Sequence, residues 1–513
     1  MFSALLDAER EFGAATEIVE DIERAPLTYK RLILASLVLG DKLACLTTRH
    51  ENAGVLLPNV NGLLATLFGL NAFGRTTALL NFTAGVKSLR SAVETAEIRT
   101  IVTSRRFIDT AKLGDVLAAL GGASHIAPPR IVYLEDIRKS ISSADKLKAA
   151  ARYAARRLVA KWRTSGPDDP AVILFTSGTE GLPKGVVLSN ANLIANALQI
   201  RKHAEQALFA TDIVMNPLPM FHSFGLTAAA LMPIFGGMRT VLYPSPLHYK
   251  QIPAMVRETQ ATVLFATDTF LQGYARAAEP GDLDTVRVAI CGAERVKDTT
   301  RGLWAKRGTS LLEGYGATEC APVISCNLPD CDAPGTVGAI LPGIEASLES
   351  VEGIAGGGKL LVRGPNVMLG YMRPERPGKI EPPPGGWHDT GDIVTIDAAR
   401  MITIKGRAKR FAKIGGEMVS LAAVEMAVAS IWPNANHVVV AVPDPRKGEQ
   451  LVLVTEKPDA ERGQLLAAIR EQGISELWAP KSILRVPQIP LLGTGKIDYS
   501  ATIELARAAQ ASP

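Results

Sequence analysis

Short apolar strands that alternate with helical stretches are the feature that most constrains the fold of this chain. Apolar runs occur at 171–175 (AVILF), 262–265 (TVLF) and 286–291 (VRVAIC), and a helical pattern fills 191–208. A strand that is buried on both faces reads as a continuous apolar run. Strands of this kind that alternate with helices form mostly parallel sheets with helices packed on their faces. We therefore predict an α/β fold with a large N-terminal domain of mixed, mostly parallel sheets covered by helices.

The texture of the sequence changes after residue 335. Gly and Pro become dense, and the strands shorten to segments such as 359–364 (KLLVRG) and 401–406 (MITIKG). This composition predicts a small β-barrel-like subdomain over 335–408, as the last part of an N-terminal domain that spans 1–408. Residues 409–513 hold two strands and two helical segments, 421–431 and 460–472, and are predicted to form a small α+β lid domain.

Composition excludes several classes of protein. The 513 residues are 47% hydrophobic with a net charge of +5, which excludes a disordered chain and is too mild to indicate nucleic-acid binding. The five cysteines form no CxxC pair, which argues against a disulfide scaffold and a zinc site. The first residues lack the apolar core of a signal peptide, and the uncharged stretch 52–74 is interrupted by Pro58. We expect a cytoplasmic protein, and a peripheral association with the inner face of the membrane stays open.

One predicted helix, 146–163, is strongly basic. It carries seven Lys or Arg residues, no acidic residue, and an apolar stripe at helical spacing. One interpretation is a solvated surface helix. The other is a docking surface for an acidic protein or an anionic membrane.

A loop suited to phosphate follows the strand at 171–175. The segment from Thr176 to Gly185 reads TSGTEGLPKG, in which glycines let backbone amides point at an anion, hydroxyls donate to phosphate oxygens, and Lys184 adds a positive charge. It is not a Walker A loop, because Pro183 precedes the lysine. A plain glycine-rich turn is the alternative.

This loop resembles the phosphate signature of the adenylate-forming, AMP-binding superfamily. The form with Glu180, FTSGTEG, is similar to that of acyl-acyl carrier protein synthetases, including those fused to an acyltransferase in 2-acylglycerophosphoethanolamine acyltransferase proteins. Further motifs follow in the superfamily's order. They are PMFHSFGL (219–226), GYGATE (314–319), WHDTGD (387–392), GRAKRFAKIGGEMVS (406–420) and GTGK (493–496). The resemblance covers nearly the whole chain, from 5 to 500.

The resemblance implies a nucleotide site and its residues. The implied ATP- or AMP-binding residues are Thr176, Ser177, Gly178, Thr179, Gly181, Lys184, Gly292, Ala293, Glu294, Gly314, Tyr315, Gly316, Thr318, Asp392, Arg407 and Lys496. The implied catalytic residues are Lys496, Glu319, Thr318, Lys184 and His222, with Glu319 as the ligand of Mg²⁺. Such chemistry needs positive charge beside the reacting phosphate and one or two carboxylates for the metal.

Each of these residues also has a structural interpretation when it is taken alone. Tyr315 suits a protein core, Glu319 a surface ion pair, Asp392 a turn, and Lys496 a solvated side chain. His222 is either a packed core residue or a gate near the reacting carboxylate. Glu180 places a negative charge in a phosphate loop, and we expect it to point away or to pair with a nearby cation.

The resemblance also implies a hinge at Lys409 that lets the C-terminal domain rotate between two half-reactions. Lys413, Gly415 and Gly416 would face the site in the second pose, where the glycines leave room for a pantetheine arm.

The implied activity is that of an acid–thiol ligase. It would activate a long-chain fatty acid with ATP and Mg²⁺ as acyl-AMP, and would then pass the acyl group to the phosphopantetheine thiol of acyl carrier protein. Coenzyme A is the alternative acceptor, and a non-catalytic nucleotide sensor is a more distant alternative. The uncharged segment 221–238 suits an acyl chain and suits plain core equally well.

Overall fold

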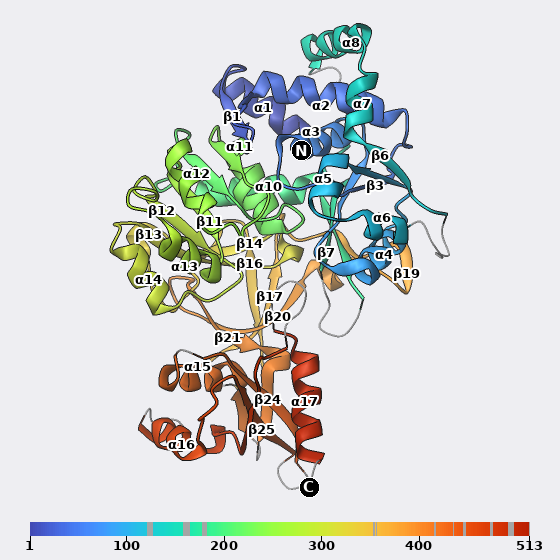
Figure 1. Ribbon diagram of the computed structural model, residues 1–513. Coiled ribbons are helices and arrows are strands. Elements are labelled where there is room, and N and C mark those ends of the chain that lie inside the picture. The colour runs from blue at the N-terminus through green and yellow to red at the C-terminus, as the bar shows by residue number, and fades with distance from the viewer. Residues whose placement is uncertain are drawn as a thin grey trace. The chain divides into compact units, whose positions relative to one another are not determined.

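The chain folds into two compact units. The computed structural model describes every residue except 121–126, 157–164, 177–181, 352–353, 355, 415–416, 434, 445–447, 472–475, 491–496 and 512–513. The first unit comprises Met1–Glu345 and Arg363–His388, and the second comprises Ala346–Val362 and Asp389–Pro513 (Figure 1).

The first unit contains a nine-stranded sheet. Its central strands, from β1 to β13, run parallel, and antiparallel strands close both edges. In spatial order the strands are β15 (Ala339–Ile340), β14 (Val323–Cys326), β13 (Ser310–Gly316), β12 (Val288–Cys291), β11 (Val263–Ala266), β9 (Ile213–Asn216), β10 (Arg239–Leu242), β1 (Glu17–Glu20) and β2 (Leu27–Thr28).

A second sheet of eight strands completes the framework of this unit. Five of its strands are parallel, and the other three extend it in antiparallel pairs. In spatial order they are β19 (Arg376–Glu381), β18 (Gly370–Arg373), β8 (Lys184–Ser189), β7 (Pro170–Thr176), β4 (Thr76–Leu79), β3 (Asn52–Val55), β5 (Thr100–Thr103) and β6 (Arg130–Tyr133). Both sheets are mixed and mostly parallel, which confirms the predicted α/β class.

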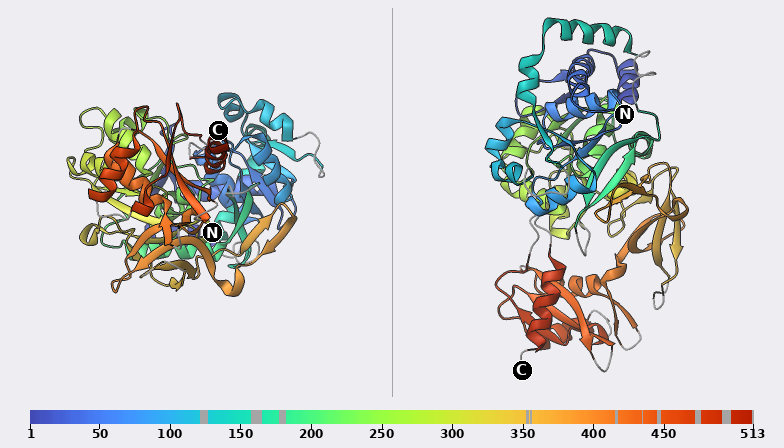
Figure 2. Two further views of the ribbon diagram at one scale, coloured as in Figure 1. Left: turned by 90° about the horizontal axis from the view of Figure 1, so that it is seen from below. Right: turned by 90° about the vertical axis from the view of Figure 1, so that its right-hand side faces the viewer.

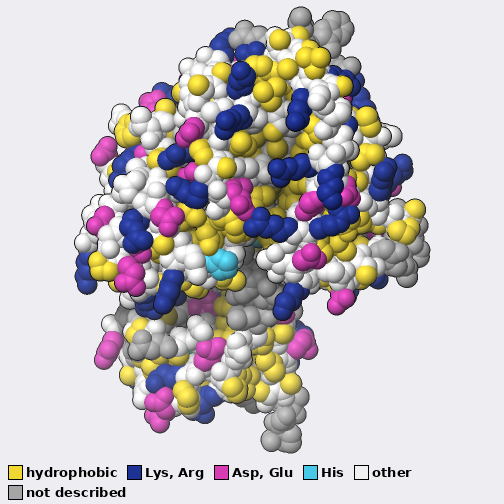
Figure 3. All heavy atoms as spheres, turned by 45° about the horizontal axis from the view of Figure 1, so that its top comes forward, with side chains coloured by type: hydrophobic (Ala, Val, Ile, Leu, Met, Phe, Trp, Pro, Cys, Tyr) yellow, Lys and Arg dark blue, Asp and Glu magenta, His cyan; other side chains and the backbone are white. Residues whose placement is uncertain are grey.

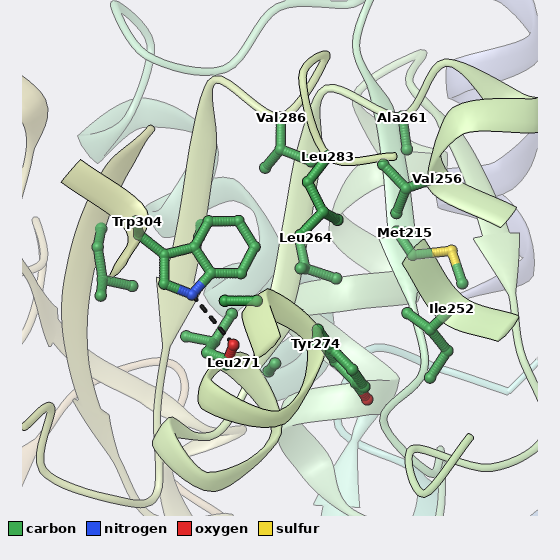
Figure 4. Close-up of a cluster of buried hydrophobic side chains, with 14 of the residues drawn as sticks. Met215, Ile252, Val256, Ala261, Leu264, Leu271, Tyr274, Leu283, Val286 and Trp304 are labelled. Carbon is green, nitrogen blue, oxygen red and sulfur yellow. Dashed lines mark hydrogen bonds between the residues drawn. The ribbon is translucent and has the colours of Figure 1, made fainter. Parts of the chain in front are cut away.

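Helices cover the faces of these sheets. One large core lies between the nine-stranded sheet and the helices α12, α13 and α14, where the indole of Trp304 donates to the carbonyl oxygen of Leu271 at 3.2 Å (Figure 4). The helices of the unit are α1 (Phe2–Phe12), α2 (Tyr29–Ala44), α3 (Asn61–Ala72), α4 (Gly85–Thr95), α5 (Arg105–Thr110), α6 (Gly114–Leu120), α7 (Leu134–Ser140), α8 (Ser143–Ala154), α10 (Asn190–His203), the π-helix η1 (Phe224–Leu231), α11 (Met232–Phe235), α12 (Gln251–Thr259), α13 (Asp268–Ala277), α14 (Asp298–Ala305) and the short 3₁₀ turns η2 (Thr318–Cys320), η3 (Pro329–Cys331) and η4 (Pro384–Gly386).

Helix α10 shows how local sequence sets an element. Ser189 caps it through a reciprocal pair, in which Ser189 Oγ accepts from the amide of Asn192 and Asn192 Oδ1 accepts from the amide of Ser189. The helix ends at His203, five residues before the predicted end at 208. The residues after His203 are mostly polar or small, and turns follow there.

The second unit holds two smaller sheets. One is a four-stranded sheet in the order β16 (Glu345–Glu349), β17 (Gly358–Arg363), β20 (His388–Ile396) and β21 (Ile402–Arg407). The other contains β23 (Glu417–Ser420), β22 (Phe411–Ile414), β25 (Gly448–Thr455), β24 (His437–Asp444) and β26 (Ser482–Arg485). Its helical elements are η5 (Ala408–Arg410), α15 (Leu421–Ile431), α16 (Arg462–Glu471), η6 (Glu476–Trp478) and α17 (Tyr499–Ala511).

The strands of the predicted β-rich region 335–408 divide between the units. β18 and β19 extend the eight-stranded sheet, whereas β17, β20 and β21 belong to the four-stranded sheet. The predicted helix at 421–431 is confirmed as α15, and the predicted α+β character of the C-terminal region is confirmed. Among the helices that the structure describes, none combines the length and apolar character of a membrane span.

Candidate active site

The candidate site of the first unit lies at the carboxyl edge of the nine-stranded sheet. The connection from β9 passes through His222 and Ser223 before the chain returns as β10 on one side, and β11 lies on the other side of β9. Ligands of open α/β sheets bind where strand order reverses in this way. The motif at 219–226 and the motifs that follow β12 and β13 therefore share one edge.

The phosphate loop begins and ends on a strand pair of the other sheet. Thr176, the last residue of β7, pairs with Lys184, the first residue of β8. The hydroxyl of Thr176 is buried, and no described residue forms a hydrogen bond with it. A buried donor that lacks a protein partner fits a ligand oxygen. The predicted loop residues Ser177, Gly178, Thr179 and Gly181, together with Glu180, lie outside the described residues.

The structure brings together Lys184 and Glu319, two of the predicted site residues. Lys184 Nζ lies 3.6 Å from Glu319 Oε1, and the Glu319 side chain is 13% exposed. Burial raises the pKa of Glu319, but the charge of His388, a hydrogen bond from Tyr371 and the charge of Lys184 together hold that pKa below its ordinary value. Glu319 is therefore a carboxylate at neutral pH, which is the form that a metal ion binds.

The turn that carries Glu319 also carries Thr318, and it contacts the His222 segment. Ser223 Oγ donates to Thr318 Oγ1 at 3.4 Å, while the His222 ring is exposed and lies 4.8 Å, between centroids, from that of Phe221. His222 is therefore not a packed core residue. It lies beside the predicted phosphate-binding threonine, so the gate interpretation stays a prediction.

The loops that follow β12 and β13 form the predicted adenine region. β12 and β13 are parallel neighbours, with Cys291 opposite Glu313, so Gly292 and Tyr315 follow at the same edge. Tyr315 is 8% exposed. Gly316 is required by close approach, because a Cβ there would lie 2.2 Å from the carbonyl oxygen of Pro322. Gly314 lies between these positions on β13.

Two further members of this region, Ala293 and Glu294, follow Gly292. Ala293 has a positive φ of 66°. The carboxylate of Glu294 accepts from the amide and the hydroxyl of Thr269, at 2.9 and 2.8 Å. Its side chain is thus held by α13.

The uncharged segment 221–238 is mainly core. The side chains of Leu226, Leu231, Met232 and Ile234 are fully buried within η1 and α11. Phe224 differs because it is half-buried. Its ring packs against Gly292 so closely that a Cβ on Gly292 would lie 2.9 Å from the ring.

Asp392 and Arg407 form a pair within the second unit. They lie opposite each other on β20 and β21, and Arg407 Nε lies 2.7 Å from Asp392 Oδ1. The Asp392 side chain is 6% exposed, whereas that of Arg407 is 66% exposed. This arrangement brings together the two residues that the sequence predicts for ribose.

The predicted hinge lies just after this pair. Lys409 is exposed in η5, and Lys413 lies on β22, where its amide donates to Glu449 at 2.6 Å. Gly415, Gly416 and Lys496 lie outside the described residues.

The basic helix is partly engaged within the chain. Lys148 and Arg152 both bind Asp41 of α2, at 2.7 and 2.6 Å, and Arg156 binds Glu9 of α1 at 2.7 Å. α8 lies against α2, at the top of Figure 1 and of the right-hand view of Figure 2. Three of the seven predicted docking charges are thus held by acidic residues of the chain itself. Residues 157–163 of the predicted helix lie outside the described residues.

The predicted apolar stripe of α8 is not its packed face. Leu147 of the apolar stripe is 73% exposed, and Ala151 and Ala154 are exposed as well, while Ala149 is buried. At the top of Figure 3, dark blue Lys and Arg side chains lie among yellow apolar ones. Arg152 thus lies on the packed face of α8 together with Ala149, whereas Leu147, Ala151 and Ala154 of the predicted apolar stripe face solvent.

Sequence reasoning missed two residues that position the site. Tyr371 donates to Glu319 at 2.6 Å. Asn59 follows β3 and holds the segment before His222, because its amide donates to the oxygen of Leu218 at 2.6 Å and its oxygen accepts from the amide of Met220 at 3.0 Å. A buried polar residue directly after an apolar strand was the available signal for Asn59.

Comparison with known proteins identifies the family. The model of the family described as AMP-binding enzyme matches residues 7–372. The chain belongs to this family. It is an adenylate-forming enzyme of the acid–thiol ligase class.

Curated relatives of this AMP-binding enzyme are ligases that use coenzyme A. A feruloyl-CoA synthase of Amycolatopsis is 28% identical over 504 residues, which is 96% of this chain and 94% of the relative. A long-chain-fatty-acid–CoA ligase of Escherichia coli O157:H7 is 31% identical over 347 residues, 64% of this chain and 61% of the relative. These relatives support the superfamily, but they do not specifically support the acyl carrier protein branch.

A solved structure shows the same fold. ATP-bound MatB from Rhodopseudomonas palustris matches with a TM-score of 0.79 at 23% identity, over 99% of this chain and 98% of the other. The match covers both units, in agreement with the predicted large α/β domain and small α+β domain.

Proposed function

We propose that this AMP-binding enzyme activates a fatty acid with ATP and Mg²⁺ and transfers the acyl group to the thiol of coenzyme A. The observation that carries the proposal is the meeting of Lys184 and Glu319 at the end of the phosphate loop, 3.6 Å apart. A lysine and a carboxylate at this distance suit a phosphate chain and the cation that accompanies it.

The residues at the end of the phosphate loop fit both the phosphates of ATP and Mg²⁺. The buried hydroxyl of Thr176 and the ammonium of Lys184 suit phosphate oxygens. Among the described residues no group of three or more metal-ligating side chains occurs. The single carboxylate of Glu319 matches Mg²⁺, which takes one or two carboxylates together with substrate phosphates and water. When bound, Mg²⁺ would neutralise charge on the phosphates.

The proposed reaction has two halves. In the first, a carboxylate oxygen of the acid attacks the α-phosphorus of ATP, so that pyrophosphate leaves and acyl-AMP forms. Lys184 neutralises charge on the leaving phosphates, Thr318 donates to the α-phosphate, and Lys496 bridges the acid and the α-phosphate. In the second half, a thiolate attacks the acyl carbon and AMP leaves.

The nucleoside is assigned to two sets of residues. Tyr315, with Gly292, Ala293, Gly314 and Gly316, offers a flat surface for adenine. Asp392 accepts from the ribose hydroxyls and Arg407 donates to them. Rotation at Lys409 would bring Lys413, Gly415 and Gly416 to the site for the thiol step.

Coenzyme A is the acceptor that the relatives' names support, and long-chain acids are among their substrates. Acyl carrier protein is the second candidate, because the loop carries Glu180 and because Arg138, Lys139 and Lys146 around α7 and α8 are exposed cations. Labelled palmitate with ATP and either coenzyme A or holo-carrier protein separates the two. A thioester that forms only with the carrier protein would overturn the choice of coenzyme A.

The class of acid needs its own measurement. Pyrophosphate release should be fastest with long-chain fatty acids when palmitate, ferulate and malonate are compared. A preference for ferulate or malonate would contradict the fatty-acid assignment, and no release with any acid would favour the nucleotide sensor.

A further inference from the structure

Tyr371 lies on the strand that flanks Lys184. β18 pairs antiparallel with β8, and Tyr371 is opposite Val186. Cross-strand partners point to the same face of a sheet, and so do residues two apart on one strand. Tyr371 and Lys184 are therefore diagonal neighbours on one face of the sheet.

The phenol of Tyr371 contacts both charged residues of the site. Its hydroxyl donates to Glu319 Oε1 at 2.6 Å, and its ring centroid lies 3.6 Å from Lys184 Nζ. Lys184 Nζ and Glu319 Oε1 are 3.6 Å apart, which is longer than a direct charge-assisted hydrogen bond of about 2.8 Å. The hydroxyl of Tyr371 thus donates a hydrogen bond to the Glu319 oxygen nearest to Lys184. The face of its ring attracts the ammonium of Lys184.

The segment around Tyr371 also holds the backbone of the Glu319 turn. The amide of Met368 donates to the carbonyl oxygen of Glu319 at 2.8 Å, and the buried side chain of Asn366 donates to the carbonyl oxygen of Cys320 at 2.7 Å. One segment therefore fixes both the main chain and the carboxylate of Glu319.

We propose that Tyr371 is a positioning residue, whose hydroxyl holds the carboxylate of Glu319 for Mg²⁺ and whose ring holds the ammonium of Lys184 for phosphate. This inference rests on the proposed function, in which Glu319 binds the metal and Lys184 binds the phosphates. Mutation of a partner that orients a metal ligand in this way typically costs about 10–100-fold in metal affinity.

The test measures ATP binding by calorimetry without a carboxylic acid, so that no reaction proceeds. Each protein is titrated with ATP in EDTA and again in Mg²⁺, and the ratio of the two affinities gives the gain due to the metal. Tyr371→Phe keeps the ring but removes the hydroxyl. It should reduce the gain about ten-fold and leave the affinity in EDTA within about two-fold of wild type.

Tyr371→Leu removes the ring as well. It should reduce the metal gain to the same extent and also weaken ATP binding in EDTA about five-fold, because the ammonium of Lys184 loses its aromatic support. A purely structural role predicts equal losses in EDTA and in Mg²⁺ for both variants, which would overturn the proposal. Tyr133→Phe is the matched control, because the Tyr133 ring also lies under a cation, with Arg105 at 4.0 Å. It should bind ATP as wild type does.

Glu319→Gln separates this proposal from the proposed function. Loss of the metal gain in Glu319→Gln but not in Tyr371→Phe would overturn the role of Tyr371 alone. Retention of the gain in both would overturn the metal role of Glu319, and the role of Tyr371 with it. Wild-type protein that binds no ATP would overturn the proposed function.

Discussion

At the residue scale, one lysine faces the proposed phosphates. Lys184→Met keeps the length of the side chain but removes its charge. We expect the rate of acyl-AMP formation to fall at least about 100-fold, the size of effect seen when one preorganised group is lost from a transition state. Exchange of labelled pyrophosphate into ATP measures this step. Lys202→Met, on an exposed residue that pairs with Glu205, is the control and should not change the rate.

Asn59 supports the site, although it is not predicted to bind any ligand itself. Asn59→Asp keeps the oxygen that accepts from the amide of Met220 but removes the donor to the carbonyl of Leu218. The buried carbonyl then loses its partner, so urea unfolding should show a loss of about 1–3 kcal/mol.

Asn59→Asp should weaken the binding of the acid substrate more than the binding of ATP. Because the held segment leads directly to His222, the KM for the acid should rise more than the KM for ATP. Asn61→Ala, at a partly exposed neighbour whose amide donates at 3.3 Å, should change neither constant. An equal rise in both constants in Asn59→Asp would contradict this positioning role.

At the element scale, the ion pairs of α8 predict how the stability of the protein depends on pH. Burial raises the pKa of Asp41, but hydrogen bonds and charge from Lys148 and Arg152 outweigh it and hold that pKa below its ordinary value. A depressed pKa stabilises the fold above the ordinary value near 3.9, and this contribution is lost as the pH falls through the folded-state pKa. Asp41→Asn should therefore lower the free energy of unfolding by about 1 kcal/mol at pH 7.

The difference between Asp41→Asn and wild type should shrink as the pH falls below 4. Denaturation in urea at several pH values measures it. Asp136→Asn, on an exposed residue paired with Arg105, is the control and should have the smaller effect at pH 7. A difference that does not change with pH would mean that the charge of Asp41 is not what stabilises α8.

Elements with a single dominant signal could be predicted from sequence. β7 and β12 are apolar runs that are buried on both faces, and they appear where such runs occur. The inward face of α8 could not be predicted, because Asp41 and Glu9 lie more than 100 residues earlier in the chain. Arg152 and Arg156 pair with these carboxylates, while Leu147, Ala151 and Ala154 of the predicted apolar stripe stay exposed, against the usual rule that the apolar stripe packs.

In the candidate site, too, residues within motifs could be predicted from sequence, whereas a residue positioned by long-range contacts could not. The superfamily motifs named Lys184 and Glu319, and the structure brings them together. Tyr371 is 52 residues from Glu319 in sequence, and it meets Glu319 only through the pairing of β18 with β8. No local pattern marks a residue whose role depends on a strand pair.

At the scale of the whole molecule, the proposed residues are shared between two units. Lys184 and Glu319 belong to the first unit, whereas Asp392, Arg407 and Lys413 belong to the second. Arg410 ties the start of the C-terminal part to α15, since it lies 2.5 Å from Glu425, and its guanidinium stacks on the ring of Tyr499 at 4.0 Å. Because the residues after Lys409 are held in this way, a rotation of the C-terminal part would have to be absorbed at or before Lys409.

A rotation at the hinge requires that the backbone at Lys409 can change conformation. Proline fixes φ near −65° and disfavours the helical region for the residue before it, so Lys409→Pro should restrict any change of backbone at 408–409. We expect acyl-AMP to form at near the wild-type rate, while its transfer to the thiol slows at least about ten-fold, because a lid or hinge step can limit turnover. Rapid-quench measurement of acyl-AMP, followed by addition of coenzyme A, separates the two steps.

Lys496→Ala provides the converse pattern. Because the proposed role of Lys496 lies in the first half, this variant should form acyl-AMP at least about 100-fold more slowly but should transfer the acyl group from supplied acyl-AMP at the wild-type rate. Lys405→Ala, on an exposed residue of β21 just before the hinge, should alter neither step. If Lys409→Pro slowed both halves equally, the two half-reactions would not differ in their need for movement at Lys409. Opposite losses in the two variants are expected if one chain uses the part after Lys409 twice, with Lys496 in the first half and Lys413 in the second.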